Sequence, residues 1–350
     1  MDAKCFTLGE GDTPLLRSRR IGPDAGLDHL YFKLETVNPT GSYKDRFAAA
    51  AISDMLANGK TRVVTCSSGN AGSALAAYSA AAGMPCQVAV FMGAPENKLK
   101  QMLAYGAKIW KIQDFGADPE ITRDTFEYLK QVGAASDAQL QISSYQYSPV
   151  SMLGVEFIGQ ELVSQSESLQ RSIDHVFSCA GGGGLILAIV RGFETALQQK
   201  EIACLPAMHC VQPAGNNTIA GPLREGADRA QACHSTTEIG GLQVASVLDG
   251  NEVITACRQT GGTGYLVEDE FVYEVQSQLA RQEGIFCEPA AAVSLAGVLQ
   301  AATEGEIQRE ETVVCLITGT GFKDQASVDR MLDSKTCPVI TLSEFIDQTT

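Results

Sequence analysis

The chain has 350 residues and a mass of 37.1 kDa, with 45% hydrophobic and 19% charged residues. This composition is typical of a globular protein with two ordinary domains and excludes an intrinsically disordered chain. The formal net charge is -15, so the chain lacks the excess of Lys and Arg that binding to nucleic acid or to an anionic membrane requires. The sequence has neither a signal-peptide run at its start nor an apolar segment of membrane-spanning length. We therefore expect a cytoplasmic protein.

Short apolar, β-branched runs alternate with Ala-rich stretches along the whole chain. The first half predicts strands at residues 62–66, 87–92 and 108–112, with helices at 71–83 and 96–106 between them. The second half predicts strands at residues 175–179, 208–214 and 313–317, with a helix at 185–197. Gly83 and Gly106 follow two of these helices, where a C-terminal cap requires a left-handed residue. The alternation predicts an α/β fold with two doubly wound parallel-sheet domains.

No Pro-, Gly- or Ser-rich linker separates the two domains, so their limits follow from the expected topology. We expect a large domain made of residues 1–47 and 151–350 and a small domain made of residues 48–150.

The cysteines and histidines give no sign of a disulfide framework or a metal site. Eleven cysteines occur without any Cys-x-x-Cys pair, and Cys66, Cys179 and Cys315 lie in apolar, strand-like runs. We expect them to be reduced, buried thiols. The four histidines share no metal-ligand spacing, so the sequence predicts no metal.

Lys44 begins an Ala-rich helix after an Asn-Pro-Thr-Gly turn. A lysine in such a place is usually a solvated surface charge. A catalytic lysine would instead be partly buried, because burial lowers its pKa and frees the amine to attack an aldehyde. The local sequence leaves both interpretations open.

Gly-, Ser- and Asn-rich turns follow three predicted strands, and in open parallel sheets ligands bind beyond the carboxyl ends of the strands. The turn at residues 67–70 is followed by a helix whose free N–H groups are suited to an anion, although a plain side-chain cap is equally consistent. Four consecutive glycines at 181–184 indicate a phosphate cradled by backbone N–H groups, with a tight structural turn as the alternative. The third turn presents Thr318 and Thr320.

Six ordered motifs, GEGDTPLL, NPTGSYKDR, SSGNAG, GGGGL, EGIFCEPAAA and TGTGFKD, together resemble the motif set of fold type II (tryptophan synthase β-like) pyridoxal-phosphate (PLP) enzymes. The resemblance is closest to the threonine synthase group and runs from about residue 9 to 324. It implies PLP as the cofactor, a small amino-acid substrate and a homodimer.

The resemblance also implies roles for individual residues. Lys44 corresponds to the lysine that holds the cofactor as a Schiff base and moves protons at the substrate's α and β carbons, and Asn70 to the residue that binds the cofactor's 3′-oxygen. Thr318 corresponds to the residue that faces the pyridine nitrogen. The phosphate cup corresponds to Gly181, Gly182, Gly183, Gly184 and Leu185. The loop for the substrate carboxylate corresponds to Ser67, Ser68, Gly69 and Ala71.

A Thr hydroxyl does not keep the ring nitrogen protonated as a carboxylate would, so the cofactor is a milder electron sink suited to elimination and replacement. One departure bears on the substrate: where threonine synthases carry an Arg for the substrate phosphate, this chain has Ser151, which removes a bidentate phosphate partner. Glu288, before Pro289, is a candidate for lining the cofactor pocket or for a structural acid at a helix start.

The sequence therefore predicts a PLP-dependent lyase or synthase of threonine synthase type that acts at the β-carbon of a small amino acid. Its substrate would be O-phosphohomoserine, giving threonine, or a related amino acid. One alternative is a threonine, serine or other hydroxyamino-acid dehydratase that gives a keto acid and ammonia. A second alternative is a non-catalytic PLP-binding protein, against which the intact Lys44 and Asn70 argue.

Overall fold

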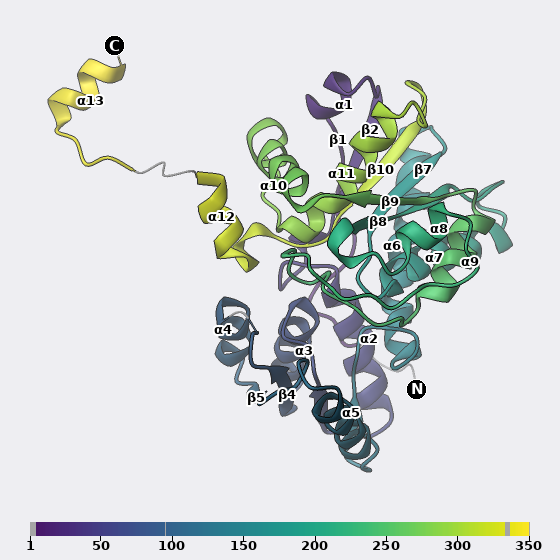
Figure 1. Cartoon of the computed structure of the whole chain (residues 1–350), viewed down its shortest axis with the longest axis vertical. Helices are drawn as coiled ribbons and strands as arrows, with labels where there is room; N and C mark the ends of the chain where they lie inside the picture. Colours follow the sequence, from purple (N-terminus) through teal and green to yellow (C-terminus); the bar gives the residue numbers. More distant parts are fainter. Residues whose placement is uncertain (1–4, 95, 333–336, 350) are drawn as a thin grey trace.

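The computed structural model describes residues 5–94, 96–332 and 337–349, and its strands form two separate sheets (Figure 1). The larger sheet has the order β1 (Leu15–Arg17), β2 (His29–Leu34), β10 (Thr312–Ile317), β7 (His175–Cys179), β8 (Ala207–Pro213) and β9 (Gly264–Val267). The smaller sheet has the order β5 (Lys108–Ile112), β4 (Cys86–Phe91), β3 (Arg62–Thr65) and β6 (Ala138–Leu140). Neighbouring strands are parallel except β1, which pairs antiparallel with β2 at the edge. The predicted α/β fold with two parallel-sheet domains is confirmed.

Helices cover both faces of the larger sheet. One face packs against α6 (Pro149–Leu169), α7 (Gly184–Gln198), α8 (Ala220–Arg224) and α9 (Gly250–Gln259), and the other against α10 (Asp269–Gln278) and α11 (Pro289–Thr303). The central strand β10 is buried along its whole length because Val314 and Leu316 face the first layer, while Val313 and Cys315 face the second. This is why the sequence of β10 is continuously apolar rather than alternating.

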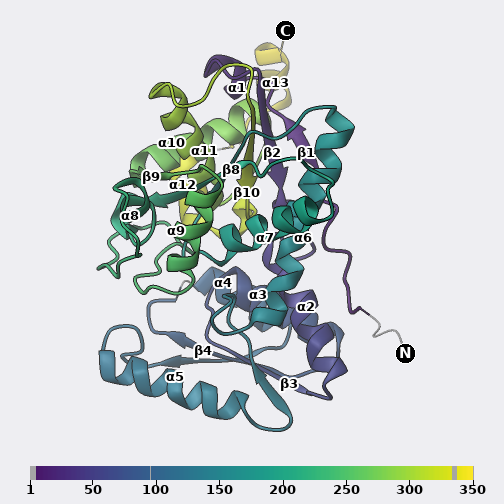
Figure 2. The same cartoon turned by 90° about the vertical axis from the view of Figure 1, so that its right-hand side faces the viewer.

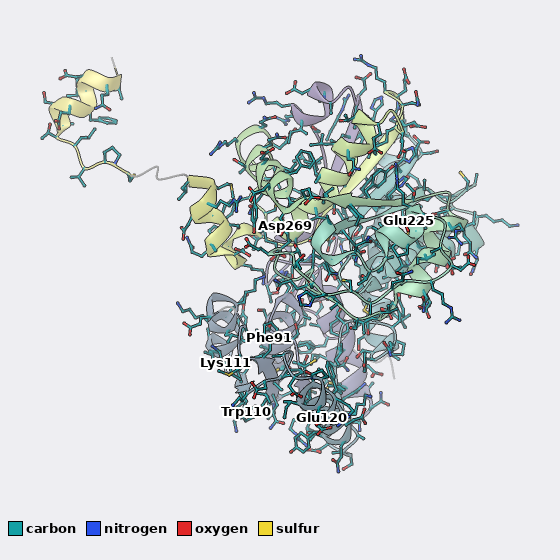
Figure 3. All side chains as sticks on the ribbon, viewed as in Figure 1. Phe91, Trp110, Lys111, Glu120, Glu225 and Asp269 are labelled. Atoms are coloured by element: carbon teal, nitrogen blue, oxygen red, sulfur yellow. The ribbon has the colours of Figure 1, made fainter. Side chains whose placement is uncertain are left out.

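The smaller sheet is covered more completely on one face than on the other. Three helices, α2 (Lys44–Ala57), α3 (Asn70–Ala81) and α4 (Glu96–Ala104), pack on one face, and α5 (Pro119–Gly133) packs on the other. Beside α5 the outer strands are partly uncovered, and Trp110 on β5 is 49% exposed. Figure 3 labels Trp110 and Phe91 in this part of the molecule. Figure 2 shows α2 and α3 between the two sheets.

The remaining elements are short. They are α1 (Ile21–Asp24), α12 (Gln325–Leu332), the single turns at Glu35–Val37, Ala214–Asn216, Leu279–Glu283 and Gly321–Lys323, and α13 (Leu342–Thr349), which lies apart from both domains in Figure 1. None of the helices in the described ranges is long and apolar enough to cross a membrane.

The structure confirms several local predictions. Gly83 and Gly106 have φ values of 70° and 82° and follow helices, as a left-handed C-terminal residue should. All eleven cysteines are free, and Cys179 and Cys315 are buried. Cys66 is only half-buried, contrary to expectation, because it directly follows β3 and borders a cavity.

All four strands of the smaller sheet fall within the predicted small domain, 48–150. Its predicted boundaries, however, fall inside helices: position 47/48 lies within α2 and position 150/151 within α6. Since α2 packs against both α3 and α6, it belongs structurally to the junction between the domains. The division of the chain at these positions stays a prediction.

Candidate active site

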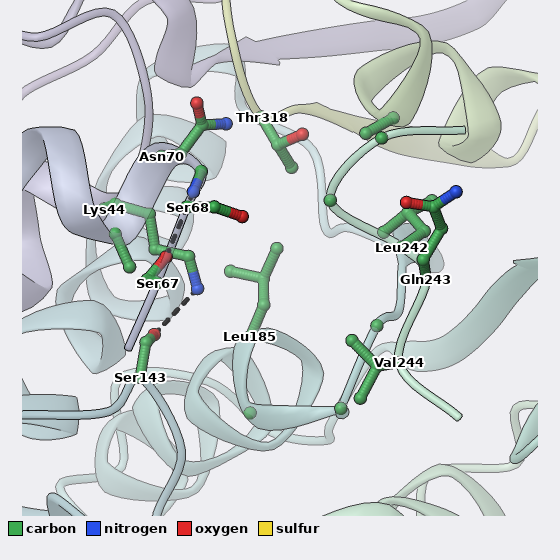
Figure 4. A pocket seen from close by; sticks show the side chains of 18 of the residues that line it. Lys44, Ser67, Ser68, Asn70, Ser143, Leu185, Leu242, Gln243, Val244 and Thr318 are labelled. Carbon is green, nitrogen blue, oxygen red and sulfur yellow. Dashed lines mark hydrogen bonds between the residues drawn. The ribbon is translucent and has the colours of Figure 1, made fainter. Parts of the chain in front are cut away.

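A cavity of about 350 Å³ lies where the carboxyl ends of both sheets meet, and this volume suits a small ligand. The predicted lysine and the three predicted turns all border it (Figure 4). The structure thereby brings together every site residue predicted from the sequence: Lys44, Ser67, Ser68, Gly69, Asn70, Ala71, Gly181, Gly182, Gly183, Gly184, Leu185 and Thr318.

Lys44 is the first residue of α2 and points into this cavity. Its Nζ donates a hydrogen bond of 2.7 Å to Ser143 Oγ and lies 4.4 Å from the centre of the Tyr43 ring. Burial disfavours the ammonium form and lowers the pKa of Lys44 from 10.5 to about 8. The positive end of the α2 dipole acts in the same direction. Lys44 is therefore not a solvated surface charge, and roughly one-tenth of its amine is neutral at pH 7.

The turn that follows β3 ends at the N-terminus of α3, where the sequence left two interpretations open. No side chain caps α3; the nearby hydroxyl of Ser67 instead accepts a hydrogen bond from the backbone N–H of Gly69 at 3.3 Å. The first N–H groups of a helix have no partner within the helix, so those of α3 stay available at the cavity. The plain side-chain cap is thus wrong, and the geometry suits a carboxylate or another anion.

The glycine run after β7 forms a second uncapped helix start. Gly183 has a φ of 96°, and no side chain caps α7. A Cβ atom on Gly182 would lie 2.7 Å from Leu248 Cδ1, and one on Gly184 would lie 2.9 Å from Asp249 Oδ2. Glycine is therefore needed because the run is packed between the cavity and the segment that contains these two residues. The turn is structurally tight and also presents its backbone to the cavity.

Thr318 directly follows β10 on the opposite wall of the cavity. It is buried, its backbone oxygen accepts a hydrogen bond from Tyr43 N at 3.1 Å, and its Oγ1 lies 3.9 Å from Cys179 Sγ. The hydroxyl has no stronger side-chain partner among the described residues, so it can bond to a ligand in the cavity.

A family model described as pyridoxal-phosphate dependent enzyme matches residues 6–319. The chain belongs to this family. Among similar curated proteins are threonine synthases from Methanosarcina acetivorans (32% identity, 92% of this chain and 77% of the relative) and Mycobacterium tuberculosis (34% identity, 91% and 83%). This protein is a PLP-dependent carbon-oxygen lyase of threonine synthase type.

Two solved structures support the same fold. Threonine deaminase isoform 2 from Solanum lycopersicum superposes with a TM-score of 0.74 at 20% identity, covering 92% of this chain and 82% of that one. Serine racemase from Dictyostelium discoideum gives a TM-score of 0.70 at 25% identity, with 88% and 92% covered. Both belong to the architecture that the sequence motifs predicted.

The cavity of this PLP enzyme fits the cofactor. The uncapped N-terminus of α7 offers backbone N–H groups for a phosphate dianion, the Lys44 amine is available for the aldehyde, and Asn70 and Thr318 offer polar groups for the ring. When bound, PLP supplies an electron sink that stabilises negative charge at the α-carbon of an amino acid.

Three features of the site of this PLP enzyme were not predicted from the sequence. Ser143 accepts the hydrogen bond from Lys44, Lys98 of α4 lines the cavity, and residues 240–244 form part of its wall. No local pattern marks these residues as part of a site, because Ser143 only follows a short strand, Lys98 lies within a helix and residues 240–244 belong to an irregular stretch.

Ser151, at the position where threonine synthases carry a phosphate-binding Arg, does not border the cavity. It is buried in α6, and its hydroxyl donates a hydrogen bond of 2.8 Å to Gln141 Oε1. Among the described residues that line the cavity, the cationic side chains are Lys44 and Lys98. A guanidinium group for a substrate phosphate is absent from these lining residues.

Proposed function

We propose that this enzyme performs elimination or replacement at the β-carbon of a small amino acid. The observation that carries the proposal is the half-buried Lys44 amine, whose pKa is lowered to about 8, in one cavity with two uncapped helix starts. One helix start suits the cofactor's phosphate and the other the substrate's carboxylate.

Each role follows from the chemistry of the residue. Backbone N–H groups at residues 67–71 would hold the α-carboxylate and so fix the orientation of the substrate. The amine of Lys44 would bind the cofactor's aldehyde and, once released, would take a proton from the α-carbon and deliver it elsewhere on the substrate. Ser143 would orient this amine through its 2.7 Å hydrogen bond.

The missing guanidinium group favours a substrate that does not depend on a phosphate. In a cavity without a bidentate partner, a phosphate dianion loses the strongest contact that a protein side chain offers. We therefore propose that the substrate is a β-substituted or hydroxylated amino acid, with O-phosphohomoserine as the competing substrate. The same observation favours the dehydratase reaction as the second candidate function.

Product analysis separates the two reactions. The PLP-loaded protein is incubated with threonine, serine, hydroxylated acidic amino acids and O-phosphohomoserine, while the visible absorption of the cofactor is followed. Formation of a keto acid and ammonia would identify a dehydratase, and release of inorganic phosphate with formation of threonine would identify a threonine synthase. A protein that binds no PLP, or whose Lys44→Ala variant retains full turnover, would refute the proposed function.

A further inference from the structure

Asn70 and Glu288 form a hydrogen bond across the cavity between two parts of the fold that are 218 residues apart in the chain. Asn70 is the first residue of α3, and its Nδ2 donates to Glu288 Oε1 at 2.5 Å. Glu288 directly precedes α11, is 2% exposed, and donates its backbone N–H to Gly319 O at 3.0 Å. The contact thus joins the start of α3 to the wall that carries Thr318.

Gly319 leaves the space in which this contact forms. A Cβ atom at this position would lie 2.3 Å from Glu288 Oε1 and 3.2 Å from Asn70 Nδ2. Any larger residue would therefore push the carboxylate away from the amide. The glycine between Thr318 and Thr320 has a specific purpose here, which is to allow the close approach of Glu288.

Lys98 supplies the opposite charge for the buried carboxylate. Its Nζ lies 3.6 Å from Glu288 Oε2, and both side chains are buried, at 7% and 2% exposure. Glu288 Oε2 accepts no hydrogen bond within the described part of the chain. Lys323, also buried, lies near enough for its charge to act on Glu288. Buried charges are retained when they are paired in this way, so Glu288 is placed as an anion.

An anionic carboxylate fixes the orientation of the Asn70 amide. A carboxylate only accepts hydrogen bonds, whereas the two ends of an amide differ, one donating and the other accepting. The contact with Glu288 therefore holds the NH₂ end of Asn70 on one side and prevents the side chain from rotating by half a turn. One N–H of this group is used by Glu288, and the other remains for a ligand.

We propose that Glu288 is a positioning residue that fixes the orientation of the Asn70 amide for the PLP ring. Lys98 supplies the opposite charge for Glu288, and Gly319 leaves room for its carboxylate. The inference rests on the proposed function, since it needs PLP in this cavity. Glu288 acts through Asn70, so removing Asn70 removes the effect of Glu288 on the cofactor.

A double-mutant cycle tests this dependence. Glu288→Gln, Asn70→Ala and the double variant are prepared as cofactor-free proteins, and the dissociation constant of PLP and the absorption band of the bound cofactor are measured. We expect Glu288→Gln alone to weaken PLP binding roughly tenfold, as loss of a charge-assisted hydrogen bond implies, and to shift the band. In the Asn70→Ala background the same substitution should change neither quantity.

Glu306→Gln is the matched control. Glu306 also lies in the large domain, pairs with Arg224 and accepts a hydrogen bond from Tyr265 Oη at 2.6 Å, but it does not line the cavity. This variant makes the same chemical change and should retain wild-type PLP affinity and absorption. Equal losses in both glutamine variants would show a general effect on stability and would overturn the inference.

Gly319→Ala provides a second route if Glu288→Gln does not fold. It keeps every charge but blocks the approach of the carboxylate, so it should reproduce the weaker binding and the shifted band. A Gly319→Ala protein with unchanged affinity and spectrum, or additive effects in the double-mutant cycle, would refute the positioning role. If wild-type protein fails to bind PLP at all, the proposed function fails instead, which keeps the two results distinct.

Discussion

The pH dependence of cofactor attachment is the sharpest prediction from the environment of Lys44. With its pKa lowered to about 8 by burial, roughly one-tenth of the amine is neutral at pH 7. For an exposed lysine with the ordinary pKa of 10.5, the neutral fraction at that pH would be roughly 300-fold smaller. The rate at which cofactor-free protein forms a covalent bond to added PLP should therefore rise about tenfold per pH unit and level off above about pH 8.

Stopped-flow absorption across this pH range measures the rate. Borohydride reduction followed by peptide mass analysis then locates the modified lysine at Lys44, and Lys44→Ala serves as the control that forms no band. A rate that continues to rise up to pH 10 would refute the burial argument, as would a stable modification that maps to another lysine.

The lowered pKa of Lys44 also has a defined effect on stability. Between about pH 8 and pH 10.5 the unfolded chain holds a proton on Lys44 that the folded, cofactor-free protein has lost. The contribution of Lys44 to stability therefore rises with pH across this window, because at this group the unfolded state binds more protons. In denaturant unfolding, the free energy of unfolding of the wild type relative to that of Lys44→Met should rise with pH across this window, and parallel pH curves would contradict it.

Three substitutions test other parts of the structure. Gly183→Ala should lower the free energy of unfolding more than Gly226→Ala. Both positions have positive φ, so an alanine costs about 1–2 kcal/mol of backbone strain at either, but only at position 183 would its Cβ atom clash. Equal unfolding free energies of the two variants would disprove this. Thr318→Ala should lower turnover while thermal stability changes little, since its hydroxyl has only a weak protein partner, and unchanged kinetics would remove its role. Arg46→Met should cost about 3–5 kcal/mol in urea unfolding, because the fully buried Glu35 loses the cation with which it forms an ion pair, whereas a loss below about 1 kcal/mol would exclude a stabilising ion pair.

The sequence alone determined the elements whose signals are local. The apolar run at residues 313–317 predicted a strand with a buried Cys315, and Gly83 and Gly106 predicted the ends of two helices. The resemblance of the six ordered motifs to those of fold type II PLP enzymes implied that Lys44, Asn70 and the glycine run border one site. The strand and helix-end predictions depend on residue types within a few positions of one another, and the prediction of the site depends on the order of short motifs along the chain.

Only the tertiary structure decided which side chains are buried and which polar groups meet. The environment of Lys44 depends on Ser143, which is 99 residues away in the chain, and that of Asn70 on Glu288, 218 residues away. Cys66 was expected in the core but borders the cavity, since exposure at the end of a strand depends on what packs beyond it. Burial and charge pairing arise from the packing of distant segments, so a local sequence pattern does not contain them.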